Sequence, residues 1–356
     1  MKSNQQKILI TGSAGFIGHH LTMAFQQLNF EIVGLDSINS YYDPVLKFNR
    51  LEEQGFERQL IKYNCLVRNS ANPNASFIQL DLTDENALEH LFREQQFDYV
   101  INLAAQAGVR YSLEHPQSYV ASNLVGFANI LENCRNYSIK HLLFASSSSV
   151  YGQNSSIPFR TGDQTDYPIS FYAATKKANE VMAYSYAHLY KIPTSGMRFF
   201  TVYGPWGRPD MAYFSFAQAI KDEKPIRIFN NGDMHRDFTY IDDVVNSIIK
   251  LLTVVPEPNE STKPADVLYK VYNIGNSQPE PLFKLVTILE QLLHKKAILD
   301  LQPMPPGDVQ STYADIQDLA KAVNYCPSTP LEVGLTRFIE WFESYYKKPN
   351  VTACFN

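Results

Sequence analysis

Short apolar runs alternate with amphipathic stretches along the first half of the chain. The runs have the length of buried strands, and the stretches between them repeat their apolar residues with the period of a helix. This pattern predicts an α/β fold with a doubly wound parallel sheet and right-handed crossovers. The expected strands are 7–10, 31–35, 75–80, 99–103, 141–145 and 194–199, and the expected helices are 16–28, 85–94, about 117–136, and one through Tyr172 to about Tyr190.

The second half is less regular, because prolines and aromatic residues interrupt the pattern from Pro205 onward. Apolar periodicity returns over 241–254, 282–293 and 331–346, which predicts further helices. The polar segment 64–74 contains several asparagines and a proline, so we expect a surface loop there. The expected domains are a cofactor domain of residues 1–199, 238–270 and 331–350 and a smaller substrate-binding lobe of residues 200–237 and 271–330.

Three glycines form the motif Gly-x-x-Gly-x-x-Gly between the first predicted strand and the first predicted helix: Gly12, Gly15 and Gly18. Glycines allow a tight turn and close backbone approach, and a helix N-terminus favours a pyrophosphate, although such glycines can also be merely structural. Asp36 ends the second predicted strand, where a carboxylate suits a ribose 2′-hydroxyl and repels a 2′-phosphate. We therefore predict a site for NAD in preference to NADP.

Tyr172 and Lys176 lie four residues apart, on one face of a predicted helix. A free tyrosine has a pKa of roughly 10 and is a poor base at neutral pH. We expect the Lys176 ammonium and a cationic cofactor ring to lower the pKa of Tyr172. The phenolate could then take a proton from a sugar hydroxyl while the carbon gives hydride to a nicotinamide. Taken alone, a tyrosine and a lysine at this spacing are more typical of a solvated helix face. The catalytic interpretation therefore depends on the glycine motif that precedes them.

Ligands of parallel α/β sheets bind beyond the carboxyl ends of the strands. Gly12, Asp36, Asp81, Ala104 and Ser147 each lie at such an end in the predicted order. The sequence therefore predicts one shared site.

Composition and charge exclude several other classes of function. A net charge of −5 without a basic run gives no reason to expect binding to nucleic acid or to a membrane surface. No apolar run approaches the ~20 residues of a membrane span, and the first strand follows Met1 so closely that we expect no signal peptide. The cysteines lack a Cys-x-x-Cys motif and the histidines lack ligand spacing, so we expect free thiols in a reducing cytoplasm and no metal.

Several segments resemble the extended short-chain dehydrogenase/reductases that act on nucleotide sugars, and the resemblance covers essentially the whole chain. The segments are Thr-Gly-Ser-Ala-Gly-Phe-Ile-Gly at 11–18, Asp81 with Leu82, Asn-Leu-Ala-Ala at 102–105, Tyr172 with Lys176, and Arg-Phe-Phe-Thr-Val-Tyr-Gly-Pro at 198–205. Within that superfamily, segments 34–43, 107–112, 202–211 and 306–309 are similar to UDP-glucuronate 4-epimerases.

The resemblance implies a Rossmann domain that keeps NAD bound through each turnover. It implies that Tyr172 deprotonates the sugar 4-hydroxyl, that Ser147 hydrogen-bonds the same oxygen, and that Lys176 holds the nicotinamide ribose. The 4-keto sugar then rotates about its diphosphate link, and hydride returns to the opposite face of the sugar. The implied NAD-binding residues are Gly12, Gly15, Phe16, Ile17, Gly18, Asp36, Asp81, Leu82, Leu103, Ala104, Ala105, Tyr172 and Lys176.

A 4-keto uronate places a chemical demand on the site. It is a β-keto acid, and it loses CO₂ readily when the bond from C5 to the carboxylate aligns with the carbonyl π system. Several fixed donors are therefore expected around the carboxylate, and Ser147, Ser148, Ser149 and Thr201 could supply them. Small residues can also simply let a strand end pack tightly, and for Ser146 the two interpretations are weighed equally.

Charged residues of the second half complete the expected substrate site. Arg236 resembles the arginine that neutralises the UDP diphosphate, with a surface ion pair as the alternative. Asp308 is expected to face the nucleotide, although an aspartate that stabilises a turn is nearly as plausible. Further candidates are Arg208, Arg110 and Gln106 near the sugar or phosphate, Arg227 and Phe229 beside the uracil, and Thr312 at the sugar 2-substituent.

The nearest alternative is a nucleotide-sugar dehydratase or decarboxylase on the same scaffold. In those relatives a carboxylate typically precedes the Val/Leu-Tyr-Gly segment, whereas here serines precede Val150. A non-catalytic NAD-binding scaffold is a second alternative. Such a protein could lose Tyr172 or Lys176, whereas this chain retains both. The sugar could also be that of UDP-glucose, a UDP-N-acetylhexosamine or a UDP-hexosaminuronate. Relatives are usually homodimers that pair the helices near 117–136 and 172–190, and we expect a homodimer here.

Overall fold

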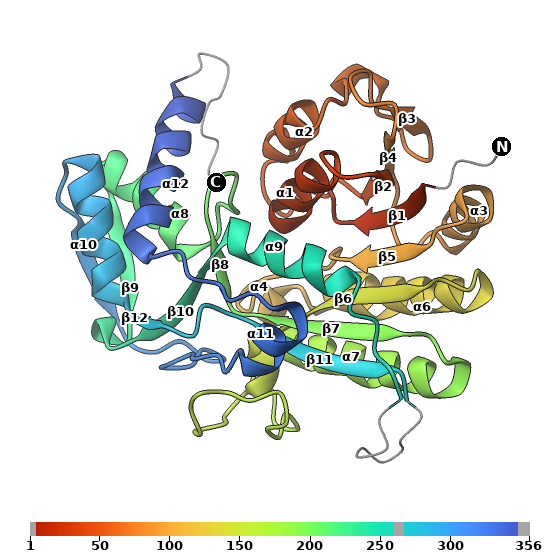
Figure 1. Ribbon diagram of the computed structural model, residues 1–356. Helices are drawn as coiled ribbons and strands as arrows, with labels where there is room; N and C mark the ends of the chain where they lie inside the picture. Colours follow the sequence, from red (N-terminus) through yellow and green to blue (C-terminus); the bar gives the residue numbers. More distant parts are fainter. Residues whose placement is uncertain (1–4, 259–266, 348–356) are drawn as a thin grey trace.

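The computed structural model describes residues 5–258 and 267–347 (Figure 1). Within these ranges the main element is an eight-stranded sheet whose neighbouring strands are parallel except at one edge, where the last two are antiparallel. The predicted α/β fold class with a parallel sheet is confirmed. In order across the sheet the strands are β11 (Tyr269–Ile274), β7 (Thr194–Phe199), β6 (His141–Ser147), β5 (Tyr99–Asn102), β1 (Gln6–Thr11), β2 (Phe30–Asp36), β4 (Ala75–Gln79) and β3 (Leu66–Arg68).

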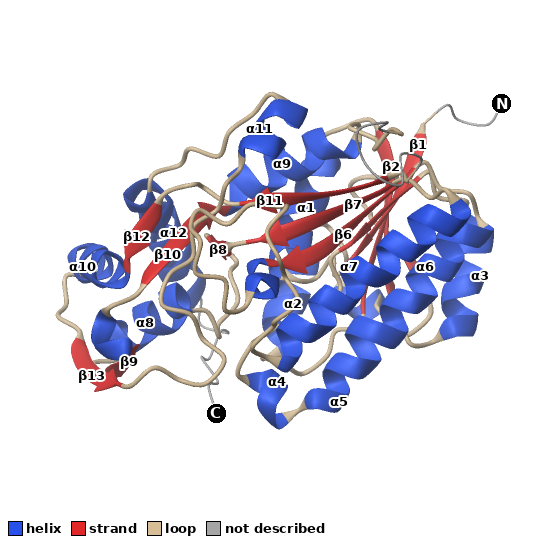
Figure 2. Cartoon of the chain, turned by 90° about the horizontal axis from the view of Figure 1, so that it is seen from below, coloured by secondary structure: helices blue, strands red, loops and turns tan. Residues whose placement is uncertain are grey.

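Helices cover both faces of this sheet, because successive residues of a strand point to opposite sides. Ile8 and Ile10 of β1 belong to one apolar core, and Leu9 belongs to another. Strands buried on both faces need nearly continuous apolar sequence, which accounts for the runs seen in the chain. The first core is covered by α1 (Phe16–Phe25), α9 (Ile241–Leu252) and α11 (Gln317–Val323), and the second by α3 (Glu85–Gln95), α6 (Gly126–Asn136) and α7 (Phe171–Tyr190), seen together in Figure 2.

A smaller lobe stands beside the carboxyl ends of the large sheet, on the left of Figure 1. Among the described residues it holds a three-stranded sheet and a parallel pair of strands. The first consists of β12 (Pro279–Pro281), β10 (His235–Tyr240) and β8 (Thr201–Tyr203), and the pair is β13 (Ile298–Gln302) with β9 (Pro225–Phe229). The helices of the lobe are α8 (Ala212–Lys221), α10 (Leu282–Leu293) and α12 (Leu331–Tyr346).

The structure differs from the expected domain bounds at several places. Helix α11 lies in the range expected for the lobe but covers the large sheet, and residues 238–240 of β10 pair with β8 of the lobe. Strand β11 pairs with β7, so residues 271–274 belong to the large sheet and not to the smaller lobe. Helix α12 packs on α10 and β10 of the lobe, where Phe338 and Trp341 contact Phe214 of α8. Apolar periodicity shows which face of a helix is buried but does not show against what. The division into two domains otherwise remains a prediction, and its residues 1–4, 259–266 and 348–350 lie outside the described ranges.

Local structure also departs from expectation. The predicted loop 64–74 contains β3, in which Val67 is buried between two exposed neighbours, a short alternation hidden by its polar flanks. The expected continuous helix 117–136 is divided into α5 (Pro116–Tyr119), a π-helical turn (Val120–Val125) and α6. Elements that the sequence did not predict are α2 (Pro44–Glu53), α4 (Tyr111–Glu114), α8, α11, the strands β8 to β13 and three 3-10 turns, Arg58–Leu60, Ser148–Tyr151 and Asn230–Gly232.

Candidate active site

One cleft of about 1070 Å³ lies at the carboxyl ends of the large sheet and is closed on the other side by the smaller lobe. The cleft brings together every residue that the sequence suggested for cofactor, catalysis or substrate, and also Arg227, Phe229 and Thr312. Their individual roles remain predictions. From the large sheet and its helices come Gly12, Gly15, Phe16, Ile17, Gly18, Asp36, Asp81, Leu82, Leu103, Ala104, Ala105, Gln106, Arg110, Ser147, Ser148, Ser149, Tyr172 and Lys176, and from the lobe side come Thr201, Arg208, Arg236 and Asp308.

The three glycines of the motif between β1 and α1 stand where there is no room for a side chain. Gly12 has φ +73°, and a Cβ added there would lie 2.8 Å from the backbone nitrogen of Ala104. A Cβ on Gly18 would lie 2.0 Å from the carbonyl oxygen of Gly12. Gly15 precedes the ten-residue α1 without a side-chain cap, so the first N–H groups of the helix remain available to an anion. This loop fits a dinucleotide pyrophosphate.

Asp36 supports the same fit at the end of β2. Its carboxylate accepts a hydrogen bond from the backbone N–H of Ile38 at 2.8 Å, and the Lys47 ammonium lies 3.5 Å away. These contacts orient a buried carboxylate at the rim of the cleft, where a ribose hydroxyl of NAD would be bound.

Tyr172 stands at the start of α7, opposite the end of β6. Ser170 caps the helix by accepting a hydrogen bond from the N–H of Ala173, which holds Tyr172 in the first turn. Burial raises the pKa of Tyr172, while a hydrogen bond with Ser147 and the charge of Arg208 act in the opposite direction. Ser147 therefore opposes the effect of burial on the candidate base.

Burial also changes the electrostatics of Lys176. Its ammonium donates a hydrogen bond to the carbonyl oxygen of Ala145 at 2.9 Å, and burial lowers its own pKa to about 8. Within the chain, Ser147 and Arg208 lower the pKa of Tyr172, and the expected effect of Lys176 together with the cofactor ring remains a prediction. Sequence spacing could not show the effect of burial, because desolvation depends on the packing around both groups.

The serine run divides into two parts. Ser146 points away from the others and donates a hydrogen bond to Glu180 at 2.6 Å. The Ser147 hydroxyl accepts a hydrogen bond from the N–H of Ser149 at 3.2 Å, and the two hydroxyl oxygens are 3.2 Å apart. Thr201 begins β8 and lines the same cleft. Ser147, Ser148, Ser149 and Thr201 therefore offer a cluster of hydroxyl groups along one wall of the cleft.

Cationic side chains line the lobe side. Arg236 forms an ion pair with Asp308 at 2.8 Å, and Arg110 lies 4.0 Å from the same carboxylate. The Arg110 guanidinium also stacks over the ring of Phe229, 4.0 Å from its centroid. The Arg208 guanidinium donates two hydrogen bonds to the Asp210 carboxylate, from Nε to Oδ1 at 3.0 Å and from Nη2 to Oδ2 at 2.5 Å. This end of the cleft suits a phosphorylated ligand.

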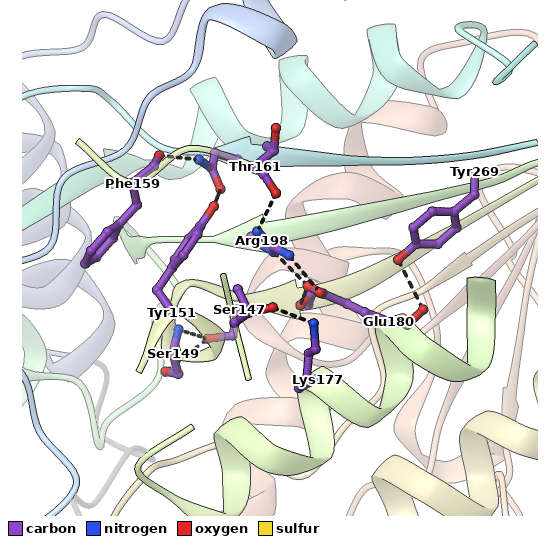
Figure 3. A network of polar contacts seen from close by, with 12 residues as sticks. Ser147, Ser149, Tyr151, Phe159, Thr161, Lys177, Glu180, Arg198 and Tyr269 are labelled. Carbon is purple, nitrogen blue, oxygen red and sulfur yellow. Dashed lines mark hydrogen bonds and ion pairs between the residues drawn. The ribbon is translucent and has the colours of Figure 1, made fainter. Parts of the chain in front are cut away.

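Sequence reasoning did not single out the buried ion pair between Glu180 and Arg198. Figure 3 shows the Arg198 guanidinium bridging both oxygens of Glu180, each at 2.8 Å. The Arg198 guanidinium also lies over the ring of Tyr151, 4.8 Å from its centroid. Glu180 lies one helical turn after Lys176, on the same face of α7. This spacing was the signal in the sequence that could have drawn attention to Glu180.

The π-helical turn was also missed. Its Asn123 exchanges hydrogen bonds with the backbone of Gln106 and donates to the hydroxyl of Thr175 on α7. Such turns often occur at functional sites. This one anchors the loop after β5 to the helix of Tyr172.

No helix in the described part of the chain is long and apolar enough to cross a membrane. In residues 5–258 and 267–347, no group of three or more His, Cys, Asp or Glu side chains is arranged to hold a metal ion. The described cysteines Cys65, Cys134 and Cys326 are free, and Cys354 lies outside the described ranges.

Comparison with known proteins agrees with this geometry. The chain is 47% identical to "Protein CapI" of Staphylococcus aureus, over 96% of this chain and 100% of that protein. It is 44% identical to UDP-glucuronate 4-epimerase 3 of Arabidopsis thaliana, over 95% of this chain and 77% of that protein. The crystal structure of UDP-glucuronic acid 4-epimerase from Bacillus cereus with UDP-glucuronic acid and NAD superposes with a TM-score of 0.83 at 30% identity, covering 96% of this chain and 100% of that chain. Residues 8–275 match the family model, and the chain belongs to the NAD dependent epimerase/dehydratase family.

Proposed function

We propose that this protein is an NAD-dependent isomerase that interconverts UDP-glucuronate and UDP-galacturonate through a transient 4-keto sugar. The observation that carries the proposal is the pairing of Tyr172 with Ser147 in a cleft that also holds the glycine loop, a cluster of hydroxyl groups and arginines. Relatives named UDP-glucuronate 4-epimerase, and the solved complex with UDP-glucuronic acid and NAD, support the same substrate.

NAD supplies the hydride acceptor and donor for C4 of the sugar. Tyr172 takes the proton of the 4-hydroxyl, and Ser147 steadies the oxygen as the carbonyl forms. Lys176, one turn further along α7, would hold the nicotinamide ribose. When hydride returns to the opposite face, Tyr172 gives the proton back, so the protein ends each turnover unchanged.

The hydroxyl cluster has a second task, which is to restrain the uronate carboxylate. Ser148, Ser149 and Thr201 can donate hydrogen bonds that keep the bond from C5 to the carboxylate near the carbonyl plane. Decarboxylation of the 4-keto sugar requires that bond to align with the carbonyl π system, so the restraint protects the intermediate.

The arginine end of the cleft would hold the nucleotide. Arg236, with Arg110 nearby, suits the diphosphate, and Asp308 offers a carboxylate to hydroxyl groups of the ribose.

The free thiols of the described cysteines and the nucleotide-sugar substrate support a cytoplasmic location.

The proposal is tested by incubating the purified protein with UDP-glucuronate without added NAD and following the anomeric protons by NMR. UDP-galacturonate should appear, because bound NAD is restored in every cycle. If a UDP-pentose or a 4-keto product accumulates instead, decarboxylation replaces the proposed reaction. If nothing changes even with NAD supplied, the uronate is the wrong substrate.

The charge of Arg208 should set the pH dependence of turnover. Arg208 lowers the pKa of Tyr172 against the effect of burial. Removing the charge in Arg208→Met should therefore raise that pKa, so the rising acid limb of kcat/KM should move to higher pH. Arg208→Lys keeps the charge and should leave the limb nearer its original place. Identical limbs in Arg208→Met and the unsubstituted protein would show that Arg208 does not act on the base.

We further propose a homodimer formed through α6 and α7. Val181 and Leu189 on α7 are 58% and 61% exposed, and Val125 beside α6 is 46% exposed, which is unusual for apolar residues of one surface. Val181→Glu should shift the protein from dimer to monomer in sedimentation velocity, because a charge would be buried at the interface. Val333→Glu, at an exposed position of α12, is the matched control. Unchanged sedimentation of both variants would place the interface elsewhere.

A further inference from the structure

Arg50 is a fully buried arginine for which the mechanism above has no use. It lies on α2, and its guanidinium donates hydrogen bonds to the carbonyl oxygen of Ala14 at 2.9 Å and to the Tyr42 hydroxyl at 2.7 Å. It also donates twice to the carbonyl oxygen of Trp206, at 3.1 and 2.7 Å, and once to that of Gly207, at 3.0 Å. All five N–H groups of the side chain are therefore engaged.

The partners of Arg50 are unusual for a buried cation. Within the described residues Arg50 forms no ion pair with a carboxylate, and its charge is met by neutral oxygens and by the ring of Tyr42, 5.6 Å from its centroid. Burying a charge in this way is costly, so the arrangement is better explained by geometry than by stability. The three acceptor segments are the glycine loop, the loop after β2 and the loop after β8.

The backbone that Arg50 holds is strained. Trp206 has φ +57°, a left-handed conformation that bulky residues rarely adopt. Its carbonyl oxygen is the one that receives two N–H groups from Arg50. The following Gly207 has no space for a side chain, because an added Cβ would lie 1.7 Å from the Tyr213 hydroxyl oxygen. Strain of this kind persists only where the surroundings enforce it, and it gathers at functional sites.

The strained turn leads directly into Arg208. That side chain is fixed on Asp210, and Asp210 in turn accepts a hydrogen bond from the Tyr41 hydroxyl at 3.1 Å. Arg208 lines the cleft and its charge acts on Tyr172. The turn therefore decides where this cation is placed.

We propose that Arg50 is a positioning residue for the epimerisation, an inference that rests on the proposed function. It holds the Trp206–Gly207 turn and thereby sets Arg208 against Tyr172 and the substrate. Through Ala14 it ties this turn to the loop that binds NAD, so the cofactor and the substrate cation share one support. A lysine cannot replace it, because three donors on a single nitrogen cannot span the three loops.

A double-mutant cycle tests the claim that Arg50 affects the reaction rate through Arg208. Arg50→Lys should lower kcat/KM for UDP-glucuronate by about 10²-fold, the order expected for a misplaced active-site group, while NAD stays bound. If Arg50 acts through Arg208, the double variant Arg50→Lys/Arg208→Met should be no slower than Arg208→Met alone. Losses that multiply would overturn the proposal. Arg58→Lys, which changes an exposed arginine eight residues further along, should behave like the unsubstituted protein.

The fluorescence of Trp206 tests the claim that Arg50 holds the Trp206–Gly207 turn, without reference to activity. The chain has two tryptophans, so Trp341→Phe leaves Trp206 as the single reporter. In that background Arg50→Lys should shift the emission to longer wavelength and increase quenching by acrylamide, whereas Arg58→Lys should not. Unchanged emission would overturn the proposal. An unsubstituted protein that is inactive on UDP-glucuronate would instead defeat the proposed function, while the fluorescence result would still stand.

Two further variants guard against simple loss of folding. Leu91→Ala opens a cavity in the core beneath α3, far from the cleft, and should lower stability without changing kcat/KM at a temperature where the protein is folded. If Arg50→Lys is insoluble, Tyr42→Phe removes one acceptor while Arg50 remains, and it should give the same fluorescence shift with smaller amplitude. Absence of that shift would count against the proposal.

Discussion

Tyr172→Phe should lower kcat for epimerisation by about 10²–10⁴-fold, the range that a positioned general base contributes. The ring remains, so packing against Tyr119, 6.1 Å away between centroids, should be kept and NAD should remain bound. The lost group is the hydroxyl that hydrogen-bonds Ser147 and exchanges a proton with the sugar. The measurement is the rate of UDP-galacturonate formation at saturating UDP-glucuronate.

Two companion variants sharpen this prediction. Tyr167→Phe removes a hydroxyl from a ring that is 69% exposed and should leave kcat unchanged. Ser147→Ala should lower kcat less than Tyr172→Phe, because it removes a hydrogen bond and leaves the base in place. If Tyr172→Phe kept a tenth or more of the activity, another group would have to be the base.

Glu180→Ala should lower the free energy of unfolding by about 3–5 kcal/mol, the range for breaking a buried ion pair from one side. The variant would leave the Arg198 guanidinium buried without its two contacts of 2.8 Å, and Ser146 without its acceptor (Figure 3). Burial by itself lowers the pKa of Arg198, but the hydrogen bonds and charge of Glu180 outweigh it and raise that pKa. The measurement is urea unfolding of NAD-saturated protein.

The controls separate the buried charge from the lost contacts. Glu180→Leu/Arg198→Met replaces both partners by apolar groups of similar size and should recover much of the loss. Glu343→Ala breaks the exposed pair with Lys347 on α12 and should cost about 0–1 kcal/mol. A loss in Glu180→Ala as small as that of Glu343→Ala would show that the pair does not stabilise the fold.

Much of the catalytic centre was visible in the sequence because its residues belong to local patterns. The strand β7 and the helices α10 and α12 have the predicted limits, since long apolar periodicity depends on burial of one face. The order of strands and helices placed Gly12, Asp36, Ala104 and Ser147 at one edge, because parallel strands present their carboxyl ends together. Residues spread over the lobe, such as Arg236 and Asp308, were reached only through the resemblance.

What local pattern could not supply was the partner of each side chain. The limits of the two domains changed because pairing of β11 with β7 and packing of α12 on α10 depend on distant segments. Burial raises the pKa of Tyr172, and the extent of burial depends on surrounding groups that residue spacing does not record.

By itself, then, the sequence determined the α/β class, the glycine loop and the candidate catalytic residues Tyr172 and Lys176, since each depends on residue types at short spacing. The tertiary structure alone decided that Arg50 joins Ala14 to Trp206, and that Glu180 neutralises Arg198. These contacts join residues separated by up to 156 positions or lying on different elements, and no periodicity records them. Their strength comes from burial, which exists only once the sheet, the helices and the lobe have packed together.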